Sequence, residues 1–439
     1  MQKSSPIKLS PAQALQGTRN VQLAESNMAP LMRIRERFTK EKPFKNLRIG
    51  MALHVTKETA VLVETLVAGG AKVAIASCNP LSTQDDVVAY LTKKGIATYA
   101  YKGESTKDYY RFIKNVIEFK PHITIDDGCD LVYEIHQHNA ELIPQILGGC
   151  EETTTGVVRL KAMEKDGALK YPVVAVNDNK TKHLFDNYYG TGQSTWDGII
   201  RATNLLIAGK TVVVAGYGSC GRGVALRAQG MGAHVIVTEV DAVRALQAHM
   251  DGYMVMPMNQ AAPLGDVFIT VTGDKHVIDE QHMKKMKSGA ILANSGHFNS
   301  EINLDALEKM ATAKKEIRPF MTEYTISNSK KLPNPKEGAN LNKSAKVLYV
   351  LGEGRLINLA AAEGHPSEVM ALSFCGQALA AEWIAKNQIP KRTLSNAVYT
   401  LPDSVDVTIA KTALTAFGVS IDTLTAEQKA YLSGWKEGT

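Results

Sequence analysis

The sequence has few cysteines, no long apolar run and no strong excess of charge of either sign. Its five cysteines include no C-x-x-C pair, so we expect neither a disulfide framework nor a metal site. The 50 Lys+Arg against 44 Asp+Glu are scattered along the chain, which argues against a nucleic-acid partner. No stretch approaches the ~20 apolar residues of a membrane span, and the N-terminus lacks the apolar core of a signal peptide. The sequence therefore predicts a cytoplasmic protein.

What the sequence does contain is an alternation of short apolar runs and amphipathic stretches. From Asn46 the runs RIGMALH, AKVAIAS and HITIDDG are separated by stretches with helical periodicity. Near-continuous β-branched runs of this kind are typical of parallel strands buried on both faces. A second alternation begins at Lys210 with TVVVAGYG, HVIVTEV, DVFITVTG and AILANSGHF. With 439 residues, 44% of them hydrophobic, the chain is predicted to be α/β, with two doubly wound parallel-sheet units in series.

The second unit carries a dinucleotide-binding motif. Gly216-Tyr217-Gly218-Ser219-Cys220-Gly221 matches G-x-G-x-x-G between a predicted strand and a predicted helix. Gly216 would permit the tight turn, Gly218 the approach of a pyrophosphate, and Gly221 close packing of helix on strand. Glu239 ends the next strand, where a carboxylate binds the ribose diol and repels a 2′-phosphate, so NAD is favoured over NADP. Arg244 is the one feature that argues otherwise.

Polar residues follow several predicted strands at their carboxyl ends, where open parallel sheets bind ligands. His54, Asp126-Asp127 and Asn177-Asp178 do so in the first unit, and Asn294 and His297 in the second. Each has an ordinary alternative as a turn or hydrogen-bonded loop residue.

Two further polar segments allow more than one interpretation. In GCEETTTGVVRL, Glu151, Glu152 and three threonines form either a capped helix start or a set of hydroxyls for ribose or nicotinamide. His136 and His138, two residues apart on a predicted helix, point to different faces, so we expect surface residues and no metal site.

Several segments taken together closely resemble the adenosylhomocysteinase (S-adenosyl-L-homocysteine hydrolase) family. They include HVTKETAVLVETLV, SCNPLSTQDD, DDGCDL, EETTTGV, VNDNKTKHLFDNYYG, NSGHF and EGRLINLAAAEGHPSEVM, in the family's order from about residue 46 to 375. The resemblance implies reversible hydrolysis of S-adenosyl-L-homocysteine to adenosine and L-homocysteine, with tightly held NAD that is regenerated at each turnover. It implies oxidation at C3′, which acidifies C4′–H and allows homocysteine to leave, before water adds and the ketone is reduced again.

The resemblance also implies roles for individual residues. The implied catalytic residues are His54, Asp127, Lys182, Asp186 and Asn187. The implied substrate contacts are Thr56, Glu58, Asp127, Glu152, Lys182, Asp186, His297 and His365. The implied cofactor contacts are Thr153, Thr154, Thr155, Asn187, Gly216, Gly218, Ser219, Cys220, Gly221, Glu239, Arg244, Asn294, Ser295, Gly296, His297 and Asn358. We expect burial beside oxidised nicotinamide to lower the pKa of Lys182.

Three positions depart from the family pattern. Thr191 stands where many members have cysteine, so a thiol there is not needed for the shared chemistry. Glu363 stands where many members have methionine beside the adenine. The chain ends LSGWKEGT, without the family's Lys- and Tyr-containing terminal peptide that reaches the neighbouring subunit's cofactor. We therefore expect weaker retention of NAD on dilution and gel filtration than in members that carry this peptide.

The domain organisation that follows is a discontinuous substrate domain, a Rossmann cofactor domain and a helical C-terminal tail. The substrate domain is predicted at 1–185 and 359–400, the NAD-binding domain at 190–355 and the tail at 401–439. Hinges near Asn187 and Leu356 suggest closure over the substrate, and the resemblance implies a homotetramer. Three alternatives stay open: a hydrolase of S-inosyl-L-homocysteine, a plain NAD-dependent 2-hydroxy-acid dehydrogenase, and an NAD-binding regulatory relative without catalysis. Glu58, a hydrogen-bond acceptor, favours adenine over hypoxanthine.

Overall fold

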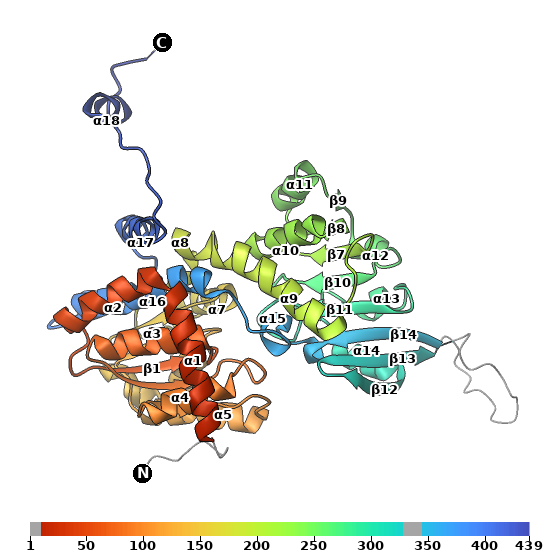
Figure 1. Ribbon diagram of the computed structural model, residues 1–439, viewed down its shortest axis with the longest axis horizontal. Helices are drawn as coiled ribbons and strands as arrows, with labels where there is room; N and C mark the ends of the chain where they lie inside the picture. Colours follow the sequence, from red (N-terminus) through yellow and green to blue (C-terminus); the bar gives the residue numbers. More distant parts are fainter. Residues whose placement is uncertain (1–9, 328–344, 439) are drawn as a thin grey trace, which may run out of the picture.

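The computed structural model describes residues 10–327 and 345–438, which form two α/β units connected by two crossings of the chain (Figure 1). The first unit contains a parallel sheet in the order β15-β6-β5-β4-β1-β2-β3. Its strands are β1 (Arg48–Ala52), β2 (Lys72–Ala76), β3 (Ala97–Tyr99), β4 (Ile123–Asp126), β5 (Gly148–Glu151), β6 (Val173–Ala175) and β15 (Val398–Tyr399).

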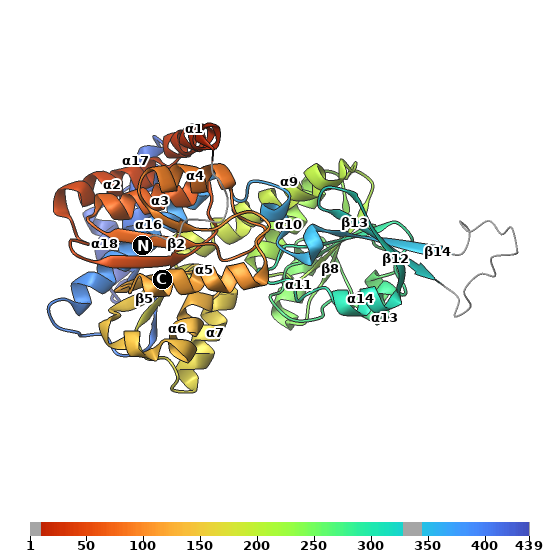
Figure 2. The same ribbon diagram turned by 90° about the horizontal axis from the view of Figure 1, so that it is seen from below.

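Helices cover both faces of this sheet (Figure 2). One face packs against α1, α2, α3, α4, α16 and α17, and the other against α5, α6 and α7. The helices of the first unit are α1 (Pro11–Asn27), α2 (Ala29–Glu41), α3 (Lys57–Ala68), α4 (Asp85–Lys93), α5 (Thr106–Glu118), α6 (Asp130–His138), α7 (Thr154–Lys165), α8 (Lys180–His183), α16 (Ser367–Gln388) and α17 (Asp403–Ala416).

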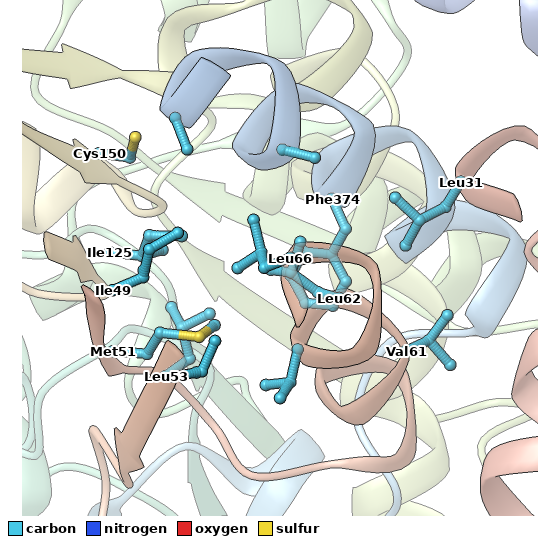
Figure 3. Close-up of a cluster of buried hydrophobic side chains, with 14 of the residues drawn as sticks. Leu31, Ile49, Met51, Leu53, Val61, Leu62, Leu66, Ile125, Cys150 and Phe374 are labelled. Atoms are coloured by element: carbon cyan, nitrogen blue, oxygen red, sulfur yellow. The ribbon is translucent and has the colours of Figure 1, made fainter. Parts of the chain in front are cut away.

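The core of the first unit follows from strand alternation and helical periodicity. Ile49 and Met51 point from β1 toward Leu62 and Leu66 of α3 and Phe374 of α16 (Figure 3). Gly50, between them on β1, faces α5 and lets that helix approach closely. An added Cβ on Gly50 would lie 3.0 Å from Val116 and Pro121. Because successive side chains on a strand point to opposite faces, one strand contributes to both layers.

The second unit is built around a mixed sheet in the order β12-β13-β14-β11-β10-β7-β8-β9. Its strands are β7 (Thr211–Ala215), β8 (His234–Thr238), β9 (Met254–Val255), β10 (Val267–Thr270), β11 (Ala290–Asn294), β12 (Ala311–Arg318), β13 (Met321–Ser327) and β14 (Ala345–Leu351). Its helices are α9 (Thr191–Thr203), α10 (Ser219–Gly230), α11 (Ala242–Met250), α12 (Met258–Ala261), α13 (Glu280–Met283), α14 (Leu304–Met310) and α15 (Ile357–Ala360).

The predicted fold class is confirmed, and the structure adds three features to it. Helices α1 and α2 precede the first strand, and β13 pairs antiparallel with both β12 and β14 at one edge of the second sheet. Strand β5 lies in the segment that the sequence suggested was a helix start. Its sequence GGCE lacks a β-branched residue, but its glycines allow close packing: an added Cβ on Gly148 would lie 2.9 Å from Ile384.

The segment predicted as a C-terminal tail, 401–439, divides into two parts. Ile409 and Ala413 of α17 belong to the core of the first unit, and Asp406 accepts backbone N–H bonds of 2.9 Å from both Lys180 and Thr181. Helix α18 (Ala426–Ser433) contains no buried residue and lies away from both units (Figure 1). The structure therefore extends the first unit beyond the predicted boundary at residue 400. Within the described ranges, no helix is long and apolar enough to cross a bilayer.

Replacing Leu62 by alanine tests the packing of the first unit. Leu62 is fully buried between β1 and α16, so Leu62→Ala should lower the free energy of unfolding by about 2–5 kcal/mol because a cavity remains. Leu23 of α1 is 60% exposed, and Leu23→Ala should change it by less than about 0.5 kcal/mol. Chemical denaturation followed by circular dichroism measures both. Equal effects of the two substitutions would contradict this account of the core.

Candidate active site

One cavity of about 1090 Å³ lies between the two units and is lined by residues of both. The carboxyl ends of β1, β4 and β6 open into it from the first unit, and those of β7, β8 and β11 from the second. Of the predicted site residues, Gly221 and Asn294 lie outside its lining, and the structure places all the others in the wall. The two sheets thus bring side chains from distant parts of the sequence to one site.

The glycine-rich turn has the geometry that its sequence predicts. Gly216 adopts a φ of +104°, and an added Cβ on Gly221 would lie 2.0 Å from the carbonyl oxygen of Gly216. Above Gly218 the space is open, with Nη1 of Arg244 as the nearest atom at 3.7 Å. Helix α10 begins at Ser219, so its free N–H groups and its dipole face the open space. This turn is shaped to receive a phosphate.

Glu239 lies at the end of the strand after this turn. Its carboxylate accepts backbone N–H bonds from Tyr217 at 2.7 Å and from Val240 at 2.7 Å. These bonds hold the carboxylate on the cavity wall, with Arg244 at the start of α11 also in the lining. A negative charge fixed here favours a ribose diol over a 2′-phosphate.

Two side-chain oxygens in the cavity wall are buried without a hydrogen-bond partner among the described residues. They are Oγ1 of Thr155, which follows the predicted Thr153–Thr154 pair, and Oδ1 of Asn358. Unpaired buried polar atoms are costly, and a ligand that bonded to them would remove that cost. Together with the open space at Gly218, these atoms fit a bound dinucleotide.

Lys182 is the centre of a buried charge cluster in the first unit. Its Nζ contacts the carboxylate of Asp186, donates to Oδ1 of Asn187 at 2.9 Å, and lies 3.6 Å from Oε1 of Glu152. Burial opposes the charge on Lys182, but the two carboxylates outweigh it and raise the pKa of Lys182. The expectation of a lowered pKa was therefore wrong, because burial was weighed without these carboxylates.

The carboxylates of this cluster are held by residues from the C-terminal part of the chain. Asp186 is hydrogen-bonded to Nδ1 of His365, and Glu152 accepts hydrogen bonds from Ser373 and Gln377 of α16. Burial raises the pKa of Glu152 to about 7, and the charge of Lys182 limits the rise. Burial opposes the charge of Asp186, but Lys182 and His365 outweigh burial and lower the pKa of Asp186, so this carboxylate would be unstable without them.

A second cluster, of imidazole and carboxylate groups, lies beside the first. Asp127 stands between two histidines, with 3.4 Å from its Oδ2 to Nε2 of His54 and 3.5 Å from its Oδ1 to Nδ1 of His297. Nδ1 of His54 lies 2.7 Å from Oγ of Ser82 and 3.2 Å from Sγ of Cys78. Burial lowers the pKa of His54 to about 4, so this imidazole is neutral near pH 7 and can accept a proton.

The far end of the cavity from the glycine-rich turn carries acceptor groups and apolar surface. Glu58 is buried and accepts a 2.7 Å hydrogen bond from Oγ of Ser367. Lys57 lies behind it, 2.7 Å from Oε2 of Glu363 and 3.4 Å from Oε1 of Glu58. Apolar and hydroxyl groups complete this end, namely Leu53, Thr56, Leu359, Met370 and Phe374.

Asn294 and His136 contact other parts of the protein and do not line the cavity. Oδ1 of Asn294 accepts from Thr270, and its Nδ2 donates 2.8 Å to the carbonyl of Phe298 and 3.0 Å to that of Gly354. Asn294 therefore fixes the loop that carries Ser295, Gly296 and His297. His136 was expected on the surface, but it is partly buried: its ring lies against Tyr171, and its Nε2 accepts from the N–H of Lys170.

The sequence did not reveal the residues that contact the predicted site residues and hold them in position. Cys78, Ser82, Ser367, Ser373 and Gln377 contact predicted site residues, and no local pattern marks them. Cys78 and Ser82 stand in SCNPLSTQDD, whose resemblance to the family could have been the signal. Cys78 also brings His54 and Asp127 into a group whose ligand atoms lie within 4.8 Å of one another, although we had expected no metal site.

Fold and site together define a class: an enzyme in which a dinucleotide-binding unit closes a cavity over a buried acid–base cluster on a second unit. Comparison with known proteins identifies the family. The family model described as "S-adenosyl-L-homocysteine hydrolase" matches residues 9–143, and that of its "NAD binding domain" matches residues 187–364. The chain belongs to the S-adenosyl-L-homocysteine hydrolase family, and its second unit is the NAD-binding domain.

Relatives with two different names have nearly the same similarity to this chain. The S-inosyl-L-homocysteine hydrolase of Methanocaldococcus jannaschii is 57% identical over 97% of this chain and 97% of its own length. The adenosylhomocysteinase of Archaeoglobus fulgidus is 54% identical over 97% of this chain and 100% of its own length. The adenosylhomocysteinase of Aquifex aeolicus is 54% identical, covering 97% of this chain and 98% of its own. The resemblance predicted from the sequence is confirmed.

Replacing Gly221 by alanine tests the glycine-rich turn. The added Cβ would lie 2.0 Å from the carbonyl oxygen of Gly216, so Gly221→Ala must displace α10 and should weaken NAD binding at least tenfold. Gly230 ends the same helix with nothing within 4 Å of its Cβ position, and Gly230→Ala should leave NAD affinity unchanged. Titration of the nucleotide-free protein with NAD measures both. Wild-type affinity in Gly221→Ala would refute the packing argument.

Proposed function

We infer that this protein hydrolyses S-adenosyl-L-homocysteine reversibly to adenosine and L-homocysteine with the aid of NAD. The observation that carries the inference is the place of Lys182 and Asp186, in the same cavity as the glycine-rich turn and beside Asp127 and His54. A thioether is a poor leaving group unless the neighbouring C4′–H becomes acidic. Bound NAD would supply the oxidant that turns the 3′-hydroxyl into a ketone and so acidifies that hydrogen.

The first cluster suits proton transfer at the 3′-hydroxyl. Lys182 is charged, because Asp186 and Glu152 stabilise its proton, and its ammonium would donate a hydrogen bond to O3′ and stabilise negative charge there. Glu152, with a pKa of about 7, would exchange the proton that O3′ releases and recovers. Asp186 would accept a hydrogen bond from a ribose hydroxyl while His365 keeps its other oxygen fixed.

The second cluster suits proton transfer at C4′ and C5′. Asp127 lies within reach of two imidazoles, so a proton that it takes from C4′ can pass to a neutral ring. His54 is neutral near pH 7 and would exchange a proton with the departing sulfur or with the water that adds to C5′. Two separate acid–base groups allow elimination and addition to proceed from one binding pose.

The base of the substrate would occupy the far end of the cavity, near Glu58. Carboxylate oxygens accept hydrogen bonds from the exocyclic amine of adenine, whereas hypoxanthine presents a carbonyl oxygen at that position. Lys57 lies outside the lining, where it pairs with Glu363, a second carboxylate of the cavity wall. Adenine is therefore our proposal. Hypoxanthine is the second candidate, because the relative from Methanocaldococcus jannaschii is named an S-inosyl-L-homocysteine hydrolase.

We also propose that the protein forms a homotetramer and acts in the cytoplasm. Support comes from the family resemblance and from the C-terminal segment after α17, where Phe417, Ile421, Tyr431 and Trp435 are all exposed. Apolar side chains of this kind are commonly covered by another subunit. Light scattering of the purified protein should give a mass of four chains, and a monomer at micromolar concentration would contradict the proposal.

Thiol release tests the proposed reaction. The purified protein incubated with NAD and S-adenosyl-L-homocysteine should release homocysteine, which a thiol reagent detects. S-inosyl-L-homocysteine should be cleaved more slowly, and the opposite order would favour the second candidate. Release from neither compound would overturn the hydrolase assignment, and accumulation of free NADH would indicate a plain dehydrogenase.

Replacing Lys182 by alanine tests its proposed part in this reaction. Lys182→Ala should lower kcat by about 10²–10⁴-fold, because a charge that stabilises O3′ is lost and Asp186 is left unpaired. Lys180 provides a control on the same short helix, since it is 64% exposed and, among the described residues, pairs with Asp403 alone. Lys180→Ala should retain wild-type kcat. Steady-state thiol release measures both, and a similar kcat for the two variants would exclude the assigned part of Lys182.

A further inference from the structure

Two carboxyl groups that the proposed mechanism does not use lie beneath the site. Asp126 and Glu151 end the neighbouring strands β4 and β5, where they are direct partners in the parallel register. Both are fully buried. Neither faces the cavity, although Asp127 and Glu152, the next residue along each strand, line it. A pair of carboxyl groups in this position needs an explanation, because burial penalises two like charges side by side.

Glu151 connects two turns that the proposed chemistry requires. Its Oε1 accepts the N–H of Gly128 at 2.8 Å and the N–H of Thr153 at 3.0 Å. Gly128 follows Asp127 and adopts a φ of +108°, and the ring of His297 lies directly against it, since an added Cβ would be 2.5 Å from Nε2 of that ring. Thr153 begins the threonine segment on the cofactor side of the cavity. One carboxyl oxygen thus fixes both turns.

Asp126 forms similar hydrogen bonds at the start of α6. Its Oδ1 accepts the N–H of Asp127 at 3.0 Å, and its Oδ2 accepts the N–H of Val132 at 2.9 Å, in the first turn of α6. Both oxygens of Asp126 are therefore occupied as acceptors. Oε2 of Glu151, in contrast, is buried and has no hydrogen-bond partner among the described residues. An ionised oxygen there would carry charge with no donor among the described residues to stabilise it.

The surrounding groups do not neutralise this pair. Arg159 of α7 is the nearest cation, and it forms a 2.6 Å ion pair with Asp130. The titratable and charged groups that face the pair from the adjoining elements are Cys78, Tyr109, Asp127, Cys129, Asp130, Cys150, Arg159 and Tyr171. Burial, together with the neighbouring carboxylates, raises the pKa of Glu151 well above its usual range, and burial raises that of Asp126 to about 7.

We propose that Glu151 holds a proton on Oε2 at neutral pH and, in this form, is a positioning residue that fixes the turn of Asp127 relative to the turn of Thr153. The inference rests on the proposed function for its catalytic readout, but the protonation itself does not. The folded state binds this proton more tightly than the unfolded chain does. As the pH rises, Glu151 loses this proton and the buried charge destabilises the folded site. The turns of Asp127 and Thr153 then lose their common support at alkaline pH.

Two substitutions of Glu151 distinguish its part as a hydrogen-bond acceptor for the two N–H groups from the effect of its charge. In Glu151→Gln the amide oxygen still accepts both N–H groups and the amide cannot ionise, so kcat near pH 7 should stay within about threefold of wild type. Its activity should also persist to higher pH than that of wild type. In Glu151→Ala both N–H groups lose their partner, so kcat should fall at least 30-fold and the Kd for NAD should rise at least fivefold. Glu164→Ala, at an exposed position of α7, should match wild type.

The proton itself is visible by infrared spectroscopy. The wild-type spectrum at neutral pH should contain a carboxylic-acid carbonyl band that Glu151→Gln lacks, whether or not the protein hydrolyses any thioether. This measurement also decides the question if Glu151→Ala fails to fold. Absence of the band from wild type, a Glu151→Gln enzyme as impaired as Glu151→Ala, or an unmoved alkaline limit in Glu151→Gln would each overturn the proposal. Failure of wild type to release thiol would instead count against the proposed function.

Discussion

The ion cluster of Lys182, Asp186 and Glu152 is the constraint on which the rest of this structure depends. An ammonium group withdrawn from water is tolerated only where carboxylates hold it in good geometry. Here the three charged groups come from three different elements: Glu152 follows β5, Lys182 belongs to α8, and Asp186 belongs to the helical turn after α8. The end of β5, the crossing between the units and α16 must therefore be placed together for the cluster to be stable.

This requirement explains why the first unit is discontinuous in sequence. Ser373 and Gln377, which hydrogen-bond to Glu152, lie more than 220 residues after it, and His365 stands 179 residues after Asp186. The chain must leave the first sheet, build the second unit and return before the hydrogen-bond partners of the cluster are in place. Because one crossing of the chain carries Lys182 and Asp186 and the other carries His365, the relative position of the two units and the state of the buried charges are linked.

The features that the sequence predicted differ physically from those that it did not predict. The glycine-rich turn was predictable because Gly216 and Gly221 answer local demands, a positive φ and a close approach, that few other residues satisfy. The hydrogen-bond donors to Glu152 and the support that Asn294 gives in the second unit were not, because hydrogen bonds between distant segments leave no periodic mark. The pKa of Lys182 was misjudged for the same reason. The motif indicates that Lys182 is buried. Weighing the effect of burial on its pKa against that of two carboxylates requires the distances between these groups.

Asn294 shows how such residues differ from those that touch a ligand. Its side chain satisfies four backbone groups and one hydroxyl around the loop that bears His297, so a polar residue at a strand end can have a purely supporting place. Glu151 is comparable on the other side of the cavity, where it supports Gly128 against the same histidine ring. His297 is thus held from both units, and its distance to Asp127 depends on two buried side chains that never reach the cavity.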